Sequence, residues 1–286
     1  MPCPPCGKIG RGMPRPCIMP KFKTYLTHGI VLRVRPLGEK DRQVSILTKE
    51  HGKIRASARG ARNPKSKLSA VTQPFVKAHF ALAQGRNFEI LTQAQIESLP
   101  AEITADMGKI AWATYICELC DSLPEDMPAP ELYSMLQNAL EHLAAAESTF
   151  DQEITGRWFE SCFLSSLGYA PTIGFCIVCE HKISIGRDER EKRVPFSVLH
   201  GGTICESCLP NARGVINVPV QVLRVLHRMT LCEKPPIPER VREMWHMDQE
   251  MLNHLRDLLR QCMEQHPEIR TKSRVFLAEI LSENLV

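Results

Sequence analysis

The hydrophobic positions change their period about a third of the way along the chain. Before that point they alternate with polar positions in short runs. In the first run Ile30, Leu32 and Val34 take one face, and Arg33 and Arg35 take the other. Such alternation is typical of β-strands, whose successive side chains point to opposite faces. Four further runs follow, RQVSILTKE, KIRASARGA, FVKAHFALA and NFEILTQAQI, with turns between them. Five short strands in so few residues predict a small closed β-barrel of the OB type.

Beyond Pro100 the apolar positions follow the period of an amphipathic helix. Helices are predicted to begin near Glu102, Glu131, Gln152, Val218, Glu239 and Ser273. The opening stretch MPCPPCGKIGRGMPRPCIMPKFK is rich in proline, glycine and basic residues and has no apolar period, which indicates disorder; Met19 is an alternative translation start. We therefore predict an α+β chain with a disordered arm over residues 1–22, an OB-fold domain over residues 23–99 and an α-helical domain over residues 100–286.

Charge is separated along the chain. Residues 1–100 carry 18 Lys+Arg and 5 Asp+Glu, a net +13, whereas the rest carries 18 and 27, a net −9. A basic N-terminal region predicts a surface that binds polyanions, against the alternative of a merely solvated face. In KIRASARGA the basic residues are predicted to share the face opposite the aliphatic ones. The residues expected to contact a nucleic-acid backbone are Arg33, Arg35, Lys53, Arg55, Arg59, Arg62, Lys65 and Lys67.

Residues 174–210, GFCIVCEHKISIGRDEREKRVPFSVLHGGTICESCLP, contain the Cys-x-x-Cys pairs Cys176 with Cys179 and Cys205 with Cys208. Two such pairs predict the tetrahedral four-sulfur shell of a structural zinc ion, one per chain, with no open position for catalysis. The 25-residue gap between the pairs is long. However, a longer loop costs only about 0.3 kcal/mol of closure entropy, against roughly 10 to 16 kcal/mol of zinc binding. Twelve cysteines and no apolar leader indicate a reducing compartment, the cytoplasm, where metal is favoured over disulfides.

Other chemistry finds little support in the sequence. Thiol redox catalysis needs a reactive cysteine pair at the start of a helix, and residues 174–210 do not show that pattern. A third pair, Cys117 with Cys120, lies in a helical pattern typical of buried core cysteines. Walker, Gly-x-Ser-x-Gly and His-Glu-x-x-His motifs are absent from the sequence. The longest uncharged run contains proline and glycines and makes a poor membrane span. We expect a protein that is not an enzyme, uses no nucleotide and does not enter a membrane.

Several of these segments together resemble one protein family. They are THGIVLRVRPLGEKDRQVSILTKEHGKIRASARGARNPKSKLSAVTQPF, LTQAQIESL, LGYAPTIGFCIVC and GGTICESC, and their order resembles that of the bacterial RecO recombination mediators from about Lys21 onward. The resemblance implies an OB-fold joined to an α-helical domain with a zinc knuckle. It further implies binding of single- and double-stranded DNA, annealing of strands coated by single-strand-binding protein, and loading of RecA with the help of RecR in gap repair.

The resemblance also extends the predicted site. It adds Lys40 and Arg42 to the basic strand and loop residues used against DNA, and it matches the four cysteines above to zinc ligands. It implies a groove in the helical domain that binds the tail of single-strand-binding protein, although the sequence does not assign its residues. It also implies a location in the bacterial cytoplasm, associated with the nucleoid. A zinc-containing RNA-binding or transcription-associated factor is the alternative interpretation, because OB barrels also bind RNA.

Overall fold

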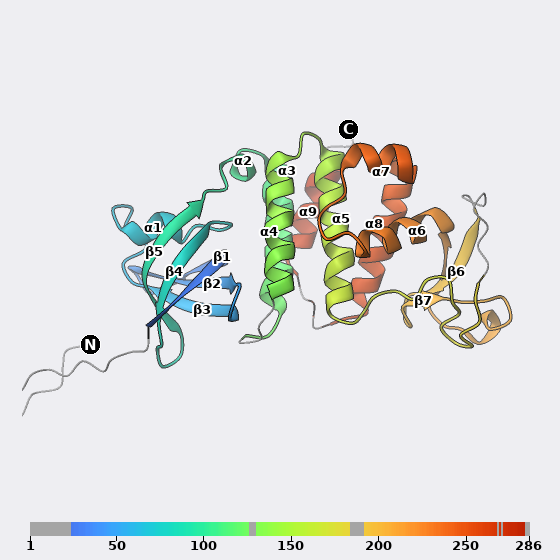
Figure 1. Ribbon diagram of the computed structural model, residues 1–286, viewed down its shortest axis with the longest axis horizontal. Helices are drawn as coiled ribbons and strands as arrows, with labels where there is room; N and C mark the ends of the chain where they lie inside the picture. The colour runs from blue at the N-terminus through green and yellow to red at the C-terminus, as the bar shows by residue number, and fades with distance from the viewer. Residues whose placement is uncertain (1–23, 126–129, 184–191, 268, 270, 284–286) are drawn as a thin grey trace, which may run out of the picture.

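The computed structural model describes residues 24–125, 130–183, 192–267, 269 and 271–283, so the predicted arm over residues 1–22 lies outside the described residues. Three parts follow one another along the long axis of the molecule (Figure 1). A barrel occupies one end, a layer of helices the middle and a small β-sheet the other end. No helix within the described part of the chain has the length and apolar character needed to span a bilayer.

Five strands close the barrel in the order β1-β2-β3-β5-β4. Their bounds are β1 (Thr24–Leu37), β2 (Asp41–Thr48), β3 (Gly52–Ala58), β4 (Lys77–Ala83) and β5 (Glu89–Ser98), with the short helix α1 (Lys67–Val71) between β3 and β4. Neighbouring strands are antiparallel except β3 and β5, which run parallel. This arrangement confirms the predicted OB-type barrel.

A β-bulge changes which side chains of β1 enter the barrel. The pairing of β1 with β2 shifts between Val31 and Arg33. As a result Val31 and Val34 both pack in the barrel core, whereas Ile30 and Leu32 belong to the core formed with the helices. The expectation that Ile30, Leu32 and Val34 share one face was therefore wrong, because a bulge adds one residue and breaks the period of two.

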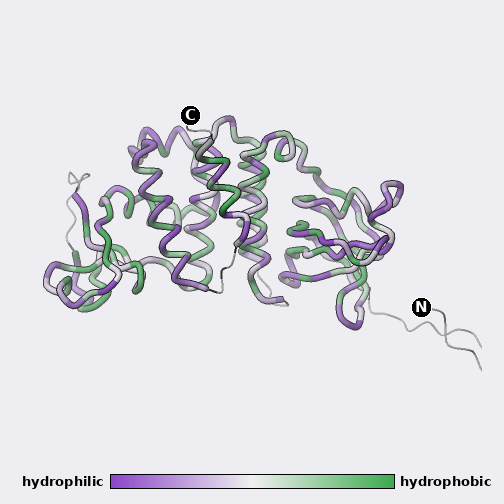
Figure 2. Tube along the Cα trace, turned by 180° about the vertical axis from the view of Figure 1, so that it is seen from behind, coloured by the Kyte–Doolittle hydropathy of each residue, from purple (hydrophilic) through white to green (hydrophobic). Residues whose placement is uncertain are grey.

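The helical part begins with α2 (Ala101–Thr104) and contains α3 (Met107–Ser122), α4 (Pro130–Ala145), α5 (Thr149–Ser166), α6 (Val220–Thr230), α7 (Pro238–Trp245), α8 (Gln249–Glu264) and α9 (Ser273–Glu283). Figure 2 shows hydrophobic and hydrophilic residues alternating along the helices, as expected where one face of each is buried. The sequence did not predict α8 as a separate helix. His246 ends α7 in a left-handed conformation (φ 49°), and Asp248 caps the start of α8.

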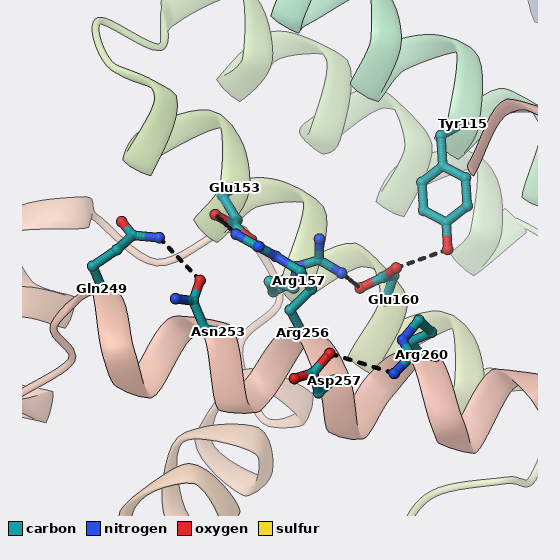
Figure 3. A network of polar contacts seen from close by, with 9 residues as sticks. All are labelled: Tyr115, Glu153, Arg157, Glu160, Gln249, Asn253, Arg256, Asp257 and Arg260. Carbon is teal, nitrogen blue, oxygen red and sulfur yellow. Dashed lines mark hydrogen bonds and ion pairs between the residues drawn. The ribbon is translucent and has the colours of Figure 1, made fainter. Parts of the chain in front are cut away.

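Helix α5 passes through the middle of the helical layer and is almost wholly buried. Its polar side chains form a buried network (Figure 3). Arg157 Nη1 lies 2.5 Å from Glu160 Oε2, and Tyr115 on α3 donates a hydrogen bond of 2.7 Å to Glu160 Oε1. Arg256 on α8 holds Glu153 through two hydrogen bonds of 2.7 and 2.8 Å. The network thus joins three helices through paired charges, the form in which buried charges are tolerated.

The chain leaves the helices after α5 to form a small three-stranded sheet in the order β7-β6-β8. The strands are β6 (Arg193–Ser197), β7 (Gly202–Thr203) and β8 (Val215–Pro219), with the 3-10 helix η1 (Leu209–Asn211) between β7 and β8. Val194, Phe196 and Val218 belong to the same hydrophobic core as the helices. The sheet therefore packs against the helical domain.

Candidate functional site

The four cysteines predicted as metal ligands meet at one point. The sulfur atoms of Cys176, Cys179, Cys205 and Cys208 all lie within 4.8 Å of one another, and Cys179 Sγ is 3.6 Å from Cys205 Sγ. A tetrahedral zinc ion with bonds of about 2.3 Å separates its sulfurs by about 3.8 Å. The donor set and its spacing therefore fit a metal ion bound by four thiolates.

Backbone hydrogen bonds shape this cluster. The Glu180 N–H donates to the Cys176 carbonyl at 2.8 Å, and Glu180 takes a left-handed conformation (φ 61°) that closes the first Cys-x-x-Cys turn. The Cys208 N–H donates to the Cys205 carbonyl at 3.1 Å and closes the second. A bond of 2.9 Å from the Ile177 N–H to the Thr203 carbonyl ties the two turns together. The ligands are therefore placed by the backbone, which suits a structural site.

The four thiols differ in acidity. Burial opposes ionisation of Cys176, but backbone N–H groups of Cys179 and Cys205 donate to its sulfur, and its pKa falls to about 6. A hydrogen bond from the Ser207 hydroxyl lowers the pKa of Cys205. Hydrogen bonds with Cys179 and Cys205 raise the pKa of Cys208 to about 12. The cluster thus retains protons, which a cation bound by four thiolates displaces.

Three of the predicted DNA-binding residues face the helical domain. Lys53 Nζ lies 2.5 Å from the backbone oxygen of Asp121 and 3.8 Å from its carboxylate, at the end of α3. Arg33 lies 3.5 Å from the same carboxylate, and Arg55 lies 2.9 Å from Glu125. The side chain of Lys53 is only 4% exposed, whereas that of Arg55 is 43% exposed. Lys53 and Arg55 therefore share the face opposite the aliphatic residues of β3, as predicted, but at Lys53 the end of α3 covers that face and excludes solvent.

The structure shows acidic partners that sequence reasoning missed. Asp121 and Glu125 lie just after the Cys117 and Cys120 pair. Nothing in the local sequence pattern indicates that Asp121 contacts Lys53, which lies 68 residues earlier in the chain. The side chain of Asp121 is 12% exposed, so its pairing with Lys53 is shielded from solvent. The separation of charge along the sequence could have indicated these ion pairs, because an acidic domain next to a basic one favours salt bridges between the two.

The other predicted residues gather at the opposite end of β1 to β3. The Arg62 N–H donates to the Lys40 carbonyl at 3.0 Å, and its guanidinium donates to the Gly38 carbonyl at 2.7 Å. The Gly60 N–H donates to the Asp41 carboxylate at 2.8 Å. These bonds hold the loop after β3 against the β1–β2 turn. We call the exposed basic residues of this region the basic loop surface: Arg35, Lys40, Arg59, Arg62, Lys65 and Lys67.

The basic loop surface differs from the paired residues in its electrostatics. None of its six side chains forms an ion pair with an acidic side chain among the residues that the structure describes. Arg42 lies beside it but is half-buried and donates hydrogen bonds to the Ser69 carbonyl and the Thr72 hydroxyl at 3.0 and 2.9 Å. Arg42 therefore positions α1, and six exposed cations are left to attract a polyanion.

Comparison with known proteins likewise separates the barrel from the rest of the chain. The family model for the N-terminal region of recombination protein O matches residues 21–99, and the model for its C-terminal region matches residues 104–275. The DNA repair protein RecO of Desulforamulus reducens is 30% identical over 268 residues, 92% of this chain and 98% of its own. That of Desulforudis audaxviator is 32% identical over 266 residues, 91% and 98% of the two chains. That of Symbiobacterium thermophilum is 34% identical over 206 residues, 72% and 79%.

Proposed function

Because the chain belongs to the RecO family of DNA repair proteins, we propose that it is a recombination mediator that binds single- and double-stranded DNA and anneals complementary strands. The observation that carries this proposal is the match of both domain models over residues 21–99 and 104–275, on a barrel with an exposed basic surface. Annealing requires that strands be held by their backbones while their bases stay free to pair. A surface of cations on loops meets that requirement, because it neutralises phosphates without reading sequence.

The basic loop surface is the DNA contact in this proposal. Four of its cations lie on the β1–β2 turn and on the loop after β3, and hydrogen bonds hold these two segments together. The other two, Arg35 and Lys67, lie on β1 and at the start of α1. If each neutralises one phosphate of a single strand, the logarithm of affinity falls with the logarithm of salt with a slope of about −4. Arg33, Lys53 and Arg55 do not take part, since their charges are already matched by acidic residues of the helical domain.

The partners in this proposal are RecR, the tail of single-strand-binding protein and the RecA pathway, and the site of action is the bacterial nucleoid. The protein performs no chemistry on DNA and uses no nucleotide. Its four cysteines hold one Zn²⁺ ion. Four thiolates complete the shell, so the ion stabilises the two Cys-x-x-Cys turns and offers no position for a reacting water.

Competition between single-stranded DNA and RNA of one sequence tests the proposal. A fluorescent DNA oligonucleotide is bound by the zinc-loaded full-length protein, and unlabelled DNA or RNA is added while anisotropy is measured. We expect DNA to compete at least as well as RNA and the binding to weaken steeply with salt. A strong preference for RNA would contradict the proposal and favour an RNA-binding or transcription-associated factor.

A further inference from the structure

Two histidines and a glutamate meet on the outside of the barrel, away from the four cysteines. His28 on β1 and His79 on β4 are register partners, and their ring centroids are 4.0 Å apart. Glu97 Oε2 on β5 lies 3.9 Å from His28 Nδ1 and 3.7 Å from His79 Nε2. The two ring nitrogens and the carboxylate oxygen all lie within 4.8 Å of one another. Three neighbouring strands thus each supply one metal-ligating group to the same point.

The backbone places Glu97 at an irregular position. Along β4 and β5, Ala78 pairs with Ile96 but Lys77 pairs with Ser98, so Glu97 is the extra residue of a bulge. Bulges re-aim side chains and are frequent beside functional sites. Lys77 Nζ donates to Glu97 Oε1 at 2.7 Å, which leaves Oε2 directed at the imidazoles. The hydrogen bond and the charge of Lys77 lower the pKa of Glu97 below its usual value.

We propose that His28, His79 and Glu97 form a second metal site, one that binds a divalent transition-metal ion such as Zn²⁺. Two imidazole nitrogens and one carboxylate oxygen are a donor set that zinc accepts at bonds of about 2.0 to 2.2 Å. Tetrahedral geometry at that bond length separates the donors by about 3.4 Å, so the observed nitrogen–oxygen distances need to shorten by about half an ångström. The three side chains are 46%, 49% and 36% exposed and free to make that adjustment.

The proposed site differs from the cysteine cluster in its chemistry. Three protein ligands leave a fourth position open to water or to another oxygen ligand. Harder nitrogen and oxygen donors also favour a different range of metals from four thiolates. Lys77 lowers the affinity for the metal ion. Its ammonium group is held at Oε1 of Glu97 and repels a cation bound at Oε2. Removing that charge is therefore expected to tighten metal binding.

Calorimetric titration of the full chain tests this proposal. The protein is first loaded with one zinc ion per chain, and further Zn²⁺ is then added. We expect the wild type to bind one additional ion, and His79→Gln and Glu97→Gln to lose at least tenfold in affinity for it. Lys77→Gln should tighten this step, and His51→Gln, which alters an exposed histidine of the same barrel outside the cluster, should leave it unchanged. The absence of a second ion in the wild type, or its undiminished binding by His79→Gln, would overturn the proposal.

Cobalt supplies a readout that does not depend on affinity. Co²⁺ added to the zinc-loaded protein should give the visible absorption of a nitrogen and oxygen site without a thiolate charge-transfer band, and Glu97→Gln should reduce it. A strong thiolate band would place the ion on cysteines, such as Cys3 and Cys6, and would contradict the proposal. Circular dichroism of each variant checks that the barrel is intact. We expect it to be, because His79 and Glu97 are 49% and 36% exposed and Lys77, 18% exposed, is replaced by another polar side chain.

Discussion

Lys53 and Arg59 carry the same charge near the two ends of β3, yet the structure gives them different roles. Lys53 is 4% exposed and bound to Asp121, whereas Arg59 is exposed and belongs to the basic loop surface. We therefore predict that Lys53→Gln lowers stability and leaves DNA binding intact, and that Arg59→Gln does the reverse. Each substitution removes one positive charge, so the two variants are matched controls for each other.

The size of the first effect follows from the contacts of Lys53. A hydrogen bond that involves a charged group contributes about 1.5 to 3 kcal/mol. Burial lowers the pKa of Lys53 although Asp121 raises it, so desolvation offsets part of the gain. We expect Lys53→Gln to lower the free energy of unfolding by about 2 kcal/mol, a factor of about 30 in the ratio of folded to unfolded protein. Arg59→Gln should change it by less than about 0.5 kcal/mol.

The size of the second effect follows from counterion release. With six phosphate contacts the affinity for single-stranded DNA falls about 300-fold between 50 and 200 mM salt. Removing the contact of Arg59 changes the slope by about 0.7, and the fall becomes about 130-fold. Urea unfolding followed by circular dichroism measures the first quantity, and anisotropy titrations at several salt concentrations measure the second. The reasoning is refuted if Lys53→Gln reduces the salt slope as Arg59→Gln does while the stability of Lys53→Gln equals that of the wild type.

Three further predictions concern the helical domain and the metal. Cys205→Ser should lower zinc content below one ion per chain and reduce the melting temperature, as metal analysis and calorimetry will show; equal stability without metal would refute a structural role. Gly156→Ala should destabilise the protein by about 1 to 3 kcal/mol in urea, because its methyl group would overlap the Trp112 ring, and an unchanged midpoint would contradict this packing. Glu160→Gln should cost about 3 kcal/mol because it leaves the buried Arg157 short of one partner, and a more stable variant would contradict the network.

Much of this architecture could be predicted from local patterns in the sequence. The strands were predicted because alternation and turns are properties of neighbouring residues. The cluster of four cysteines was predicted because Cys-x-x-Cys spacing dictates how two sulfurs point. The break between α7 and α8 was missed because a left-handed residue ends α7, and that residue is His246 instead of the glycine that usually marks such a helix end.

The features that sequence reasoning missed depend on contacts between distant segments. The burial of Lys53 depends on α3, whose Asp121 lies 68 residues later in the chain. The meeting of His28, His79 and Glu97 depends on β1 and β5 both pairing with β4, an order that the strand patterns alone do not specify. Register and strand order are properties of the closed barrel, so single strands do not reveal them.

Annealing of complementary oligonucleotides is the measurement that tests the central claim most directly. Two strands are precoated with the cognate single-strand-binding protein and mixed with the zinc-loaded chain without nucleotide, at low and physiological salt. Wild-type protein should accelerate annealing of the coated strands, more strongly at low salt, and a variant with Arg59, Arg62 and Lys65 all changed to Gln should lose most of that acceleration. Annealing at the uncatalysed rate with wild-type protein, on coated and bare strands alike, would contradict the proposed mediator function.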